Sequence, residues 1–461
     1  MPFIASISGI RGTLKDPHGL TPELVLEYVL GLGVYFKKKY LNKKINIIIA
    51  RDGRASGETI SKLIIASLNF LGIDTIDIGQ VTTPTAGIFV KKSKFQGAVV
   101  ITASHNPENW NGLKFLNEQG EFLSSRDLDK VYSLVENKSY KNYLVLENKF
   151  GKNIQNGSAL DFHIKKILSL KEIKKLEISK RNLKVAVDGI NSVGGPAMEK
   201  LLKVLGVKQV LFINKKMSKG FGHNPEPLEK NLTELKKVVI KNNCDLGVAV
   251  DPDGDRLALM CENGKFFGEE NTLVTASKYI LEISENKVSV SNLSSSQSLK
   301  NITESLGGKY FFSKVGEINV VEKMKKVKAV IGGEGNGGVI FPNLHYMRDS
   351  LVGISLILSY LSTSSFMTLS KLKDSLPHYV MLKEKLNLSK DKLELLYKVL
   401  KIEFKNNEIN EEDGLKIIFI DKWVHLRPSN TEPICRVYIE AKNNIEAKGI
   451  LDIINNKISN L

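Results

Sequence analysis

The stretch 98-AVVITASHNPENWNGLKF-115 decides how the chain is organised, because it places a small polar loop directly after an apolar segment. Residues 98–101 are continuously apolar, which predicts a buried strand, and residues 102–107 are small, polar or proline, which predicts a tight loop. The loop carries Ser104 beside His105. Ligands of open parallel sheets bind at strand ends, so the Ser104 hydroxyl could be a nucleophile or a phosphate carrier. An ordinary Ser/Thr turn is the alternative that this stretch leaves open.

The residues before this stretch predict an α/β domain. Thr21 followed by Pro22 is typical of a helix start, and we expect that helix to reach about Tyr40. The other expected elements are a strand at 45–50, a helix at 58–71, a strand at 73–78 and a turn at 82–85. Alternation of strands and helices is typical of an α/β fold, and this domain is expected to end near residue 150.

An apolar strand followed by a glycine-rich turn occurs three times, at 44–53, 184–196 and 328–340. These copies lie too far apart for a solenoid repeat, so we expect three related α/β domains in series. Three unrelated strand-turn units would give the same pattern. A smaller α+β region is expected after a lysine-rich segment. The predicted domains are 1–150, 151–256, 257–370 and 371–461.

The composition narrows the class of protein. A chain of 461 residues is too long to fold around a single hydrophobic core, so we expect several domains. No apolar run reaches the length of a membrane span, and no signal segment precedes Arg11, so we expect a cytoplasmic protein. Cys244, Cys261 and Cys435 have no metal or disulfide spacing and are expected to be buried thiols.

The net charge of +16 comes mostly from scattered lysines, without a stacking or groove-reading motif. We therefore expect no nucleic-acid partner. Most arginines, in contrast, lie in or beside Gly-, Asp-, Pro- or Ser-rich motifs. A guanidinium grips phosphate or carboxylate in a bidentate way, so this placement indicates several anion contacts.

Three carboxylates follow the apolar segment 246–250 in the motif DPDGDR, at Asp251, Asp253 and Asp255. Their alternation directs them to one side, and hard oxygen ligands suit Mg²⁺ or a similar ion. A solvated acidic turn is the alternative. A calcium EF-hand fails, because its sixth position requires glycine and here holds Arg256, and because a strand rather than a helix precedes the loop.

Two later loops carry anion- or sugar-binding groups. RPSNTEP at 427–433 combines a guanidinium, two hydroxyls and an amide, which are the parts of a phosphate cradle, although a plain polar turn is the alternative. GGEGNGG at 332–338 lacks the spacing of a dinucleotide fingerprint, and its Glu334 and Asn336 could hydrogen-bond sugar hydroxyls.

With these motifs in order, the whole chain resembles the α-D-phosphohexomutase superfamily, which includes phosphoglucomutase, phosphomannomutase and phosphoglucosamine mutase. TASHNP resembles its phosphoserine loop, DPDGDR its metal loop, GEGN its sugar loop and RPSNTEP its phosphate loop. The resemblance implies four domains around a central cleft. It also implies an isomerase-class phosphotransferase that interconverts hexose 6-phosphate and hexose 1-phosphate through a phosphoserine and a bisphosphate.

The resemblance also implies roles for individual residues. Ser104 would carry the phosphate and, with the three aspartates, hold one Mg²⁺ per chain. The groups near the transferred phosphate would be Arg11, His105, Lys114 and Arg256. Glu334 and Asn336 would recognise the sugar, and the second phosphate would be bound by Arg427, Ser429, Asn430 and Thr431.

The sequence departs from two bacterial subfamily patterns. Gly338 stands where the sugar loop often has histidine, so His345 or Lys114 is considered for proton transfer. Asn430 stands where bacterial phosphoglucosamine mutases usually have glycine. The loops look most similar to archaeal-type phosphoglucosamine mutases, so glucosamine 6-phosphate is the expected substrate. Glucose or mannose phosphates and, in a different reaction, a phosphoserine-dependent phosphatase are the alternatives; the oligomeric state is left open.

Overall fold

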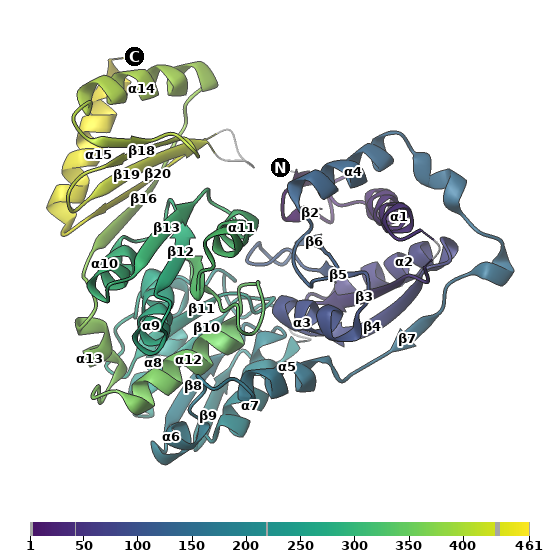
Figure 1. Ribbon diagram of the computed structural model, residues 1–461, viewed down its shortest axis with the longest axis horizontal. Helices are drawn as coiled ribbons and strands as arrows, with labels where there is room; N and C mark the ends of the chain where they lie inside the picture. Colours follow the sequence, from purple (N-terminus) through teal and green to yellow (C-terminus); the bar gives the residue numbers. More distant parts are fainter. Residues whose placement is uncertain (1–2, 42, 218–219, 429–433, 461) are drawn as a thin grey trace. The chain divides into compact units, whose positions relative to one another are not determined.

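The computed structural model describes residues 3–41, 43–217, 220–428 and 434–460 (Figure 1). The chain divides into two compact units. The first unit runs to Thr272 and includes Gly337–Leu372; the second consists of Leu273–Asn336 and the chain from Lys373 onward. Among the described residues, no helix is long and apolar enough to cross a membrane.

The first sheet of the first unit has seven strands in the order β1-β2-β6-β5-β3-β4-β7. Its strands β5, β3, β4 and β7 are parallel, and β1, β2 and β6 run antiparallel to their neighbours. The strands are β1 Phe3–Ser6, β2 Gly9–Thr13, β3 Asn46–Arg51, β4 Asp74–Gln80, β5 Gly97–Ile101, β6 Trp110–Leu116 and β7 Asn153–Gln155. Every residue of β5 is buried, as its continuous apolar sequence predicts.

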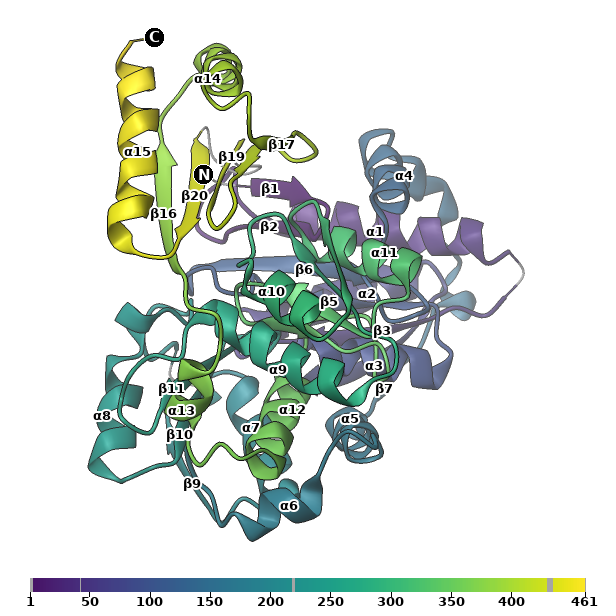
Figure 2. The ribbon, with the colours of Figure 1, turned by 60° about the vertical axis from the view of Figure 1, so that its left-hand side comes forward.

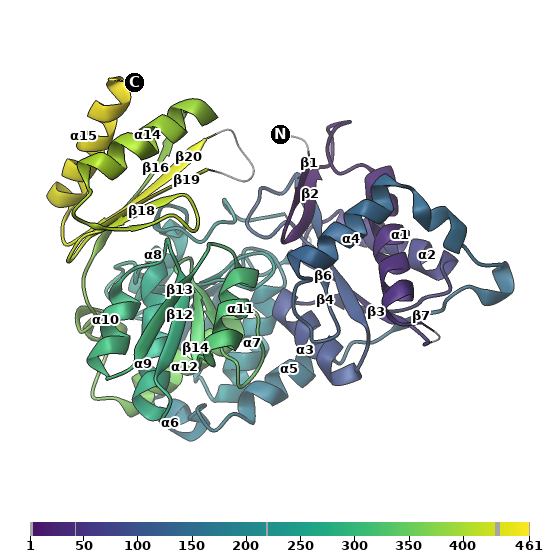
Figure 3. The ribbon, with the colours of Figure 1, turned by 45° about the horizontal axis from the view of Figure 1, so that its top comes forward.

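Helices cover both faces of this sheet. Ile47, Ile49 and Val99 pack with α1, α2 and α4, whereas Ile48 and Ala98 pack with α3 on the other face (Figure 3). The helices are α1 Pro22–Lys39, α2 Gly57–Phe70, α3 Thr83–Ser93 and α4 Ser125–Glu136. Successive side chains of a strand point to opposite faces, so a strand that is apolar throughout is buried from both sides.

The second sheet of the first unit has the order β11-β10-β8-β9, with only β11 antiparallel. Its strands are β8 Lys184–Asp188, β9 Gln209–Ile213, β10 Leu246–Val250 and β11 Leu257–Cys261. The unit also contains α5 Ala159–Leu168, α6 Lys175–Lys180, α7 Gly194–Leu205, α8 Thr233–Lys241, β15 Gly338–Ile340 and α12 Ser350–Thr363. Helix α12 is apolar on nearly all sides and is buried over most of its length.

The second unit contains the parallel strands β13-β12-β14 and a five-stranded antiparallel sheet in the order β16-β20-β19-β18-β17. Helices α14 and α15 pack on one face of the five-stranded sheet (Figure 2). The elements are β12 Val288–Asn292, α10 Ser298–Ser305, β13 Lys309–Ser313, α11 Glu317–Val327, β14 Ile331–Glu334, β16 Val380–Leu386, α14 Lys390–Glu403, β17 Glu408–Asn410, β18 Leu415–Ile418, β19 Trp423–Pro428, β20 Cys435–Ala441 and α15 Asn444–Ser459. Two further helices, α9 Glu269–Ile283 and α13 Leu369–Asp374, span the boundaries between the units.

The predicted α/β class with a C-terminal α+β region is confirmed by these sheets, and all three thiols are buried. The predicted turn at 82–85 is wrong, because these residues begin α3. The Thr82 hydroxyl caps that helix by accepting the Thr85 N–H, and Pro84 is tolerated in the first helical turn. The third strand-turn copy also lies later than expected, since β14 begins at Ile331 and includes two of the glycines.

Candidate active site

The loop after β5 holds Ser104 in a strained and buried position. Ser104 has φ 49°, in the left-handed region that few residues other than glycine adopt, and is only 6% exposed. Its N–H donates to Thr102 Oγ1 at 2.9 Å, and the Thr102 hydroxyl donates to Asp52 Oδ2 at 2.7 Å. The loop is therefore tied to the end of β3, the strand that neighbours β5 in the sheet.

Arg54 fixes the carbonyl groups of the same loop. Its Nη2 donates to the Ser104 and Asn106 carbonyls at 2.7 and 2.8 Å, and its Nη1 donates to the Pro107 and Trp110 carbonyls at 2.7 and 3.0 Å. Its Nε donates to the Asp52 carboxylate. A planar guanidinium can serve this many acceptors in fixed directions. Arg54 thus shapes the backbone that presents the serine.

The three aspartates lie in the loop after β10, and the first of them contacts the serine. The Ser104 Oγ donates to Asp251 Oδ2 at 3.0 Å. The other oxygen, Asp251 Oδ1, accepts the backbone N–H groups of Asp255 and Arg256 at 3.0 and 3.1 Å, which closes the loop around Gly254 at φ 68°. Two loops distant in sequence therefore meet at a serine hydroxyl and a carboxylate.

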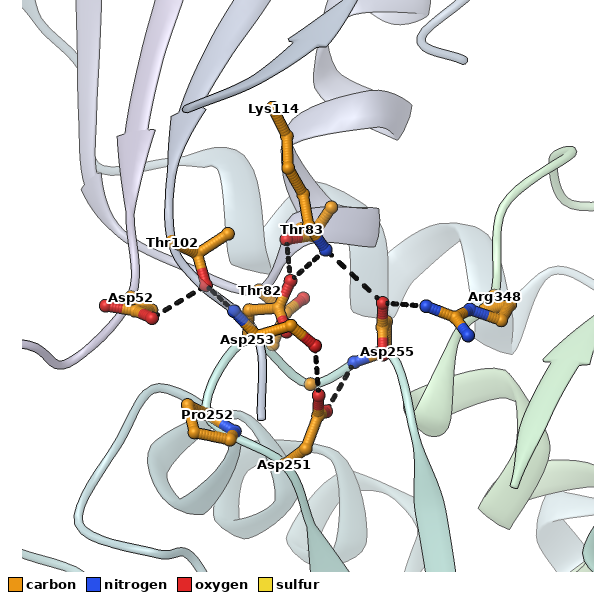
Figure 4. Close-up of polar contacts among 12 residues, drawn as sticks. Asp52, Thr82, Thr83, Thr102, Lys114, Asp251, Pro252, Asp253, Asp255 and Arg348 are labelled. Carbon is orange, nitrogen blue, oxygen red and sulfur yellow. Dashed lines mark hydrogen bonds and ion pairs between the residues drawn. The ribbon is translucent and has the colours of Figure 1, made fainter. Parts of the chain in front are cut away.

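Cationic and hydroxyl groups bind the other two aspartates (Figure 4). The Lys114 ammonium lies 2.7 Å from Asp253 Oδ2 and 3.4 Å from Asp255 Oδ2. Arg348 Nη2 donates to the same Asp255 oxygen at 2.6 Å, and the Thr83 hydroxyl donates to Asp253 Oδ2. Burial alone would lower the pKa of Lys114, but the two carboxylates together raise it, so this side chain is cationic.

The aspartate oxygens fit a hard divalent cation. One oxygen each from Asp251, Asp253 and Asp255 lies within 4.8 Å of the others, and all three residues are buried. The Oδ1 atoms of Asp253 and Asp255 have no hydrogen-bond partner among the described residues, although both are buried. Burial and the two neighbouring carboxylates raise the pKa of Asp251 well above its ordinary value. A bound cation would supply the missing partner and the missing positive charge.

Three more residues from the sequence prediction lie around Ser104. His105 Nδ1 is 3.4 Å from the Ser104 Oγ. Burial and the Arg256 and Arg11 guanidinium groups lower the pKa of His105 well below its ordinary value, so its imidazole is neutral. Arg11 donates to the Asn106 side chain at 3.0 Å, and Arg256 lies 3.5 Å from Glu226.

The second unit holds the other predicted site residues. Glu334 is 5% exposed and its Oε1 accepts from the Asn292 amide at 2.9 Å and from the Gly316 N–H at 3.1 Å. Asn336 follows two residues later, whereas Gly338, at the start of β15, belongs to the first unit. Arg427, near the end of β19, lies 3.5 Å from Asp413. The loop residues Ser429, Asn430 and Thr431 lie outside the described residues.

Sequence reasoning missed three residues of this site: Arg54, Thr83 and Arg348. The sequence did hold an indication for Arg54 and Arg348, because arginines are few in this chain and both lie in or beside polar motifs. Thr83 had none, since a threonine near a helix start is common and its partner, Asp253, is 170 positions away.

Four family models, all described as phosphoglucomutase/phosphomannomutase, match the chain in series. Alpha/beta/alpha domains I, II and III match residues 5–142, 161–264 and 269–379, and the C-terminal domain matches residues 381–457.

Relatives of known name match along nearly the full length. A "Phosphoglucomutase/phosphomannomutase" of Thermococcus kodakarensis is 32% identical, and a "Phosphoglucosamine/phosphogalactosamine mutase" of Sulfurisphaera tokodaii is 31% identical; each match covers 96% of both chains. A solved phosphoglucomutase/phosphomannomutase family protein of Burkholderia thailandensis has a TM-score of 0.82 at 23% identity, covering 96% of this chain and 94% of that one.

Proposed function

Because the chain belongs to the phosphoglucomutase/phosphomannomutase family, we propose that it interconverts glucosamine 6-phosphate and glucosamine 1-phosphate through a phosphorylated Ser104. It is an enzyme of the isomerase class, a phosphotransferase that acts on hexose phosphates. The observation that carries the serine assignment is the contact of the Ser104 hydroxyl with Asp251; the neutral His105 ring lies beside the same hydroxyl, and Lys114 pairs with the neighbouring Asp253.

The proposed reaction has two phosphoryl transfers. A free sugar hydroxyl attacks the phosphorus of phosphorylated Ser104; its O–P bond forms as the Oγ–P bond breaks, and the product is a hexose bisphosphate. After the bisphosphate turns over, its other phosphate returns to the Ser104 Oγ and the new sugar monophosphate leaves. In the transition state, negative charge is redistributed over the phosphoryl oxygens and the entering and leaving oxygens, and cations placed to stabilise that charge lower the barrier.

The residues around Ser104 take separate roles in this proposal. Lys114 and Arg11 face negative charge on the transferring phosphoryl group, and Arg256 is placed to bind the substrate beside it. Over the first transfer the sugar hydroxyl loses its proton and the Ser104 Oγ gains one. His105 is neutral and its Nδ1 lies 3.4 Å from Oγ, so this ring is placed to give Oγ that proton as the Oγ–P bond breaks and to take it back when Oγ attacks the bisphosphate. Arg54 acts indirectly, by holding the loop.

Asp251, Asp253 and Asp255 would hold one Mg²⁺ together with an oxygen on Ser104. Such an ion supplies positive charge to the phosphoryl oxygens. The two buried aspartate oxygens without partners support this assignment. Asp253→Asn should weaken Mg²⁺ binding by about tenfold or more, because a neutral amide replaces an anionic ligand.

Calorimetry with Mg²⁺ on the full chain measures this loss, and the exposed Asp129→Asn is the matched control. Equal Mg²⁺ affinity in Asp253→Asn and in the control would remove the aspartates from a metal role.

Glu334 and Asn336 are proposed to recognise sugar hydroxyls, and Arg427 with Ser429, Asn430 and Thr431 to bind the phosphate that is not being transferred. The contacts of Glu334 support this role, because the Asn292 amide and the Gly316 N–H both donate to its Oε1 and so orient the buried carboxylate. A preoriented carboxylate accepts hydrogen bonds from sugar hydroxyls without losing further side-chain freedom.

The choice of sugar rests on relatives that carry phosphoglucosamine mutase in their names, such as the one from Sulfurisphaera tokodaii. The test is a set of parallel assays with the 6-phosphates of glucosamine, glucose and mannose. We expect the highest kcat/KM with glucosamine 6-phosphate. Preference for glucose or mannose phosphate would reassign the substrate, and release of free phosphate without sugar 1-phosphate would indicate a phosphatase instead.

A further inference from the structure

Two buried histidines converge on one carboxylate away from Ser104. His163 Nε2 and His345 Nε2 lie 2.9 and 3.0 Å from the same atom, Asp349 Oδ2. The other oxygen, Asp349 Oδ1, accepts the Leu351 and Val352 N–H groups and so caps helix α12. Asp349 therefore has four donors, and its position is fixed from two sides.

The residues on both sides of Asp349 hold the aspartate loop. Arg348 Nη2 donates to Asp255 Oδ2 at 2.6 Å. Ser350 donates to the Gly254 carbonyl twice, from its hydroxyl at 2.7 Å and from its N–H at 3.3 Å. A shift of Asp349 would therefore move groups that contact two consecutive residues of that loop.

One of these histidines, His163, is also connected to the aspartate loop through the start of α3. His163 Nδ1 is 2.8 Å from the Thr85 Oγ1, and Thr85 is hydrogen-bonded to the Thr82 hydroxyl that caps α3. Thr83, which follows Thr82, is fixed by two hydrogen bonds to the loop. Its N–H donates to the Asp253 carbonyl at 2.9 Å, and its hydroxyl donates to the Asp253 carboxylate. The N-termini of α3 and α12 both contact the aspartate loop, and His163 connects them through its contacts with Thr85 and Asp349.

This arrangement does not suit His345 for proton transfer to a substrate. His345 is 4% exposed, its Nε2 is engaged with Asp349, and its Nδ1 is buried. A transition-metal site is also disfavoured. A metal-bound His345 would carry its proton on Nδ1, and that atom has no acceptor among the described residues, whereas ligating histidines normally donate from the second nitrogen.

We propose that His163 and His345 are positioning residues, which lock Asp349 and through Arg348, Ser350 and Thr83 hold the Asp253–Asp255 loop in its cation-binding shape. The proposal rests on the proposed cation role of that loop. It does not depend on which sugar the enzyme uses.

The test compares His345→Phe, which removes the donor but fills the space, with His345→Gln, whose amide nitrogen can replace Nε2. The exposed His18→Phe is the control. Each full-length variant is titrated with Mg²⁺ alone by calorimetry, and kcat and KM are measured with the best sugar phosphate. His345→Phe should weaken Mg²⁺ binding and lower kcat by about tenfold each, with KM for sugar changed less than about twofold. His345→Gln should recover most of both losses.

A second variant, Ser350→Ala, removes a single hydroxyl and keeps the proposal testable if His345→Phe does not fold. It should weaken Mg²⁺ binding by about threefold. Unchanged Mg²⁺ affinity in Ser350→Ala and in any folded His345 variant would overturn the proposal. So would a His345→Gln variant that is as inactive as His345→Phe but binds Mg²⁺ normally, which would indicate proton transfer.

Elemental analysis of the purified parent chain gives a third check. If the parent chain holds a stoichiometric transition metal and His345→Phe loses it, the positioning proposal is wrong and the two histidines with Asp349 form a metal site. Because Mg²⁺ is titrated without sugar, failure of the mutase assays would contradict the proposed function and leave the positioning proposal standing.

Discussion

The Ser104 hydroxyl donates a 3.0 Å hydrogen bond to Asp251 across 147 positions of the chain. Each residue lies just after the end of a buried strand, Ser104 after β5 and Asp251 after β10. The contact places an oxygen that can carry phosphate within reach of carboxylates that can hold a cation. Those two groups are what phosphoryl transfer through a serine requires.

Ser104→Ala should abolish mutase turnover and phosphoprotein formation, because no other hydroxyl replaces Oγ as the phosphate carrier. The fold should persist with a stability change of about 1 kcal/mol or less, since a single loop hydroxyl is lost. Steady-state kinetics and intact-protein mass spectrometry provide the measurements. The exposed Ser125→Ala should behave like the parent chain. Substantial turnover in Ser104→Ala would mean that another group carries the phosphate.

Arg54→Lys should lower stability by about 2–4 kcal/mol, because an ammonium cannot serve four carbonyls and a carboxylate in fixed directions. The change should appear as a lower urea midpoint together with reduced phosphorylation of Ser104, whose carbonyl loses its donor. Arg126 is exposed, and Arg126→Lys is the matched control, expected within about 0.5 kcal/mol of the parent. A urea midpoint equal to that of the parent would show that the Ser104 loop keeps its shape without the guanidinium of Arg54.

Local pattern predicted much of this fold. The apolar run 246–250 is strand β10 with the same ends, and Thr21 and Pro22 begin helix α1 as capping rules predict. The prediction failed at residues 82–85, where the same local sequence is compatible with a turn and with the start of a helix. Thr82 and its neighbours are polar enough for a turn, but they become a helix start once Thr82 accepts the Thr85 N–H.

The aspartates and the serine were predicted as site residues because their residue types carry the chemistry, and the structure brings Ser104 and Asp251 into contact. Their supporting partners were not, since Arg348 meets Asp255 across 93 positions and Thr83 meets Asp253 across 170. No local periodicity encodes such pairs, which depend on how the strands order themselves in two separate sheets.

His223 gives a pH-dependent contribution to stability that is independent of catalysis. Burial lowers its pKa, but the hydrogen bond and charge of Asp188, 2.9 Å away, raise it more, so the folded-state pKa lies above the unfolded value of about 6.5. Below the unfolded pKa both states are protonated and the ion pair contributes fully. As pH rises through the folded pKa, the proton is lost and so is this contribution.

The measurement is the difference in urea midpoint between the parent chain and His223→Gln, followed from about pH 5.5 to pH 8.5. The difference in favour of the parent should be largest at the acidic end and shrink with rising pH. A difference that stays constant, or grows with pH, would contradict a raised pKa for His223.

Arg427→Lys should impair the use of sugar phosphate and spare the serine. Arg427 lies 3.5 Å from Asp413, whose Oδ2 also accepts the Val315 N–H at 2.9 Å, so the guanidinium is held at one end of β19 by a fixed carboxylate. Lysine keeps the charge but loses the planar fork. A hydrogen bond to a charged group contributes about 1.5–3 kcal/mol, so kcat/KM should fall about ten- to a hundredfold.

Ser104 phosphorylation should survive in Arg427→Lys, because the two residues serve different phosphates in the proposed reaction. Steady-state kinetics is therefore paired with mass spectrometry of the intact protein, and Arg126→Lys again serves as the exposed control. Asp413→Asn separates orientation from charge. Its amide oxygen can still accept the Val315 N–H, but the ion pair with Arg427 is gone, so a smaller loss in kcat/KM than in Arg427→Lys is expected. Parent-like efficiency in Arg427→Lys would remove Arg427 from phosphate binding, whatever Asp413→Asn does.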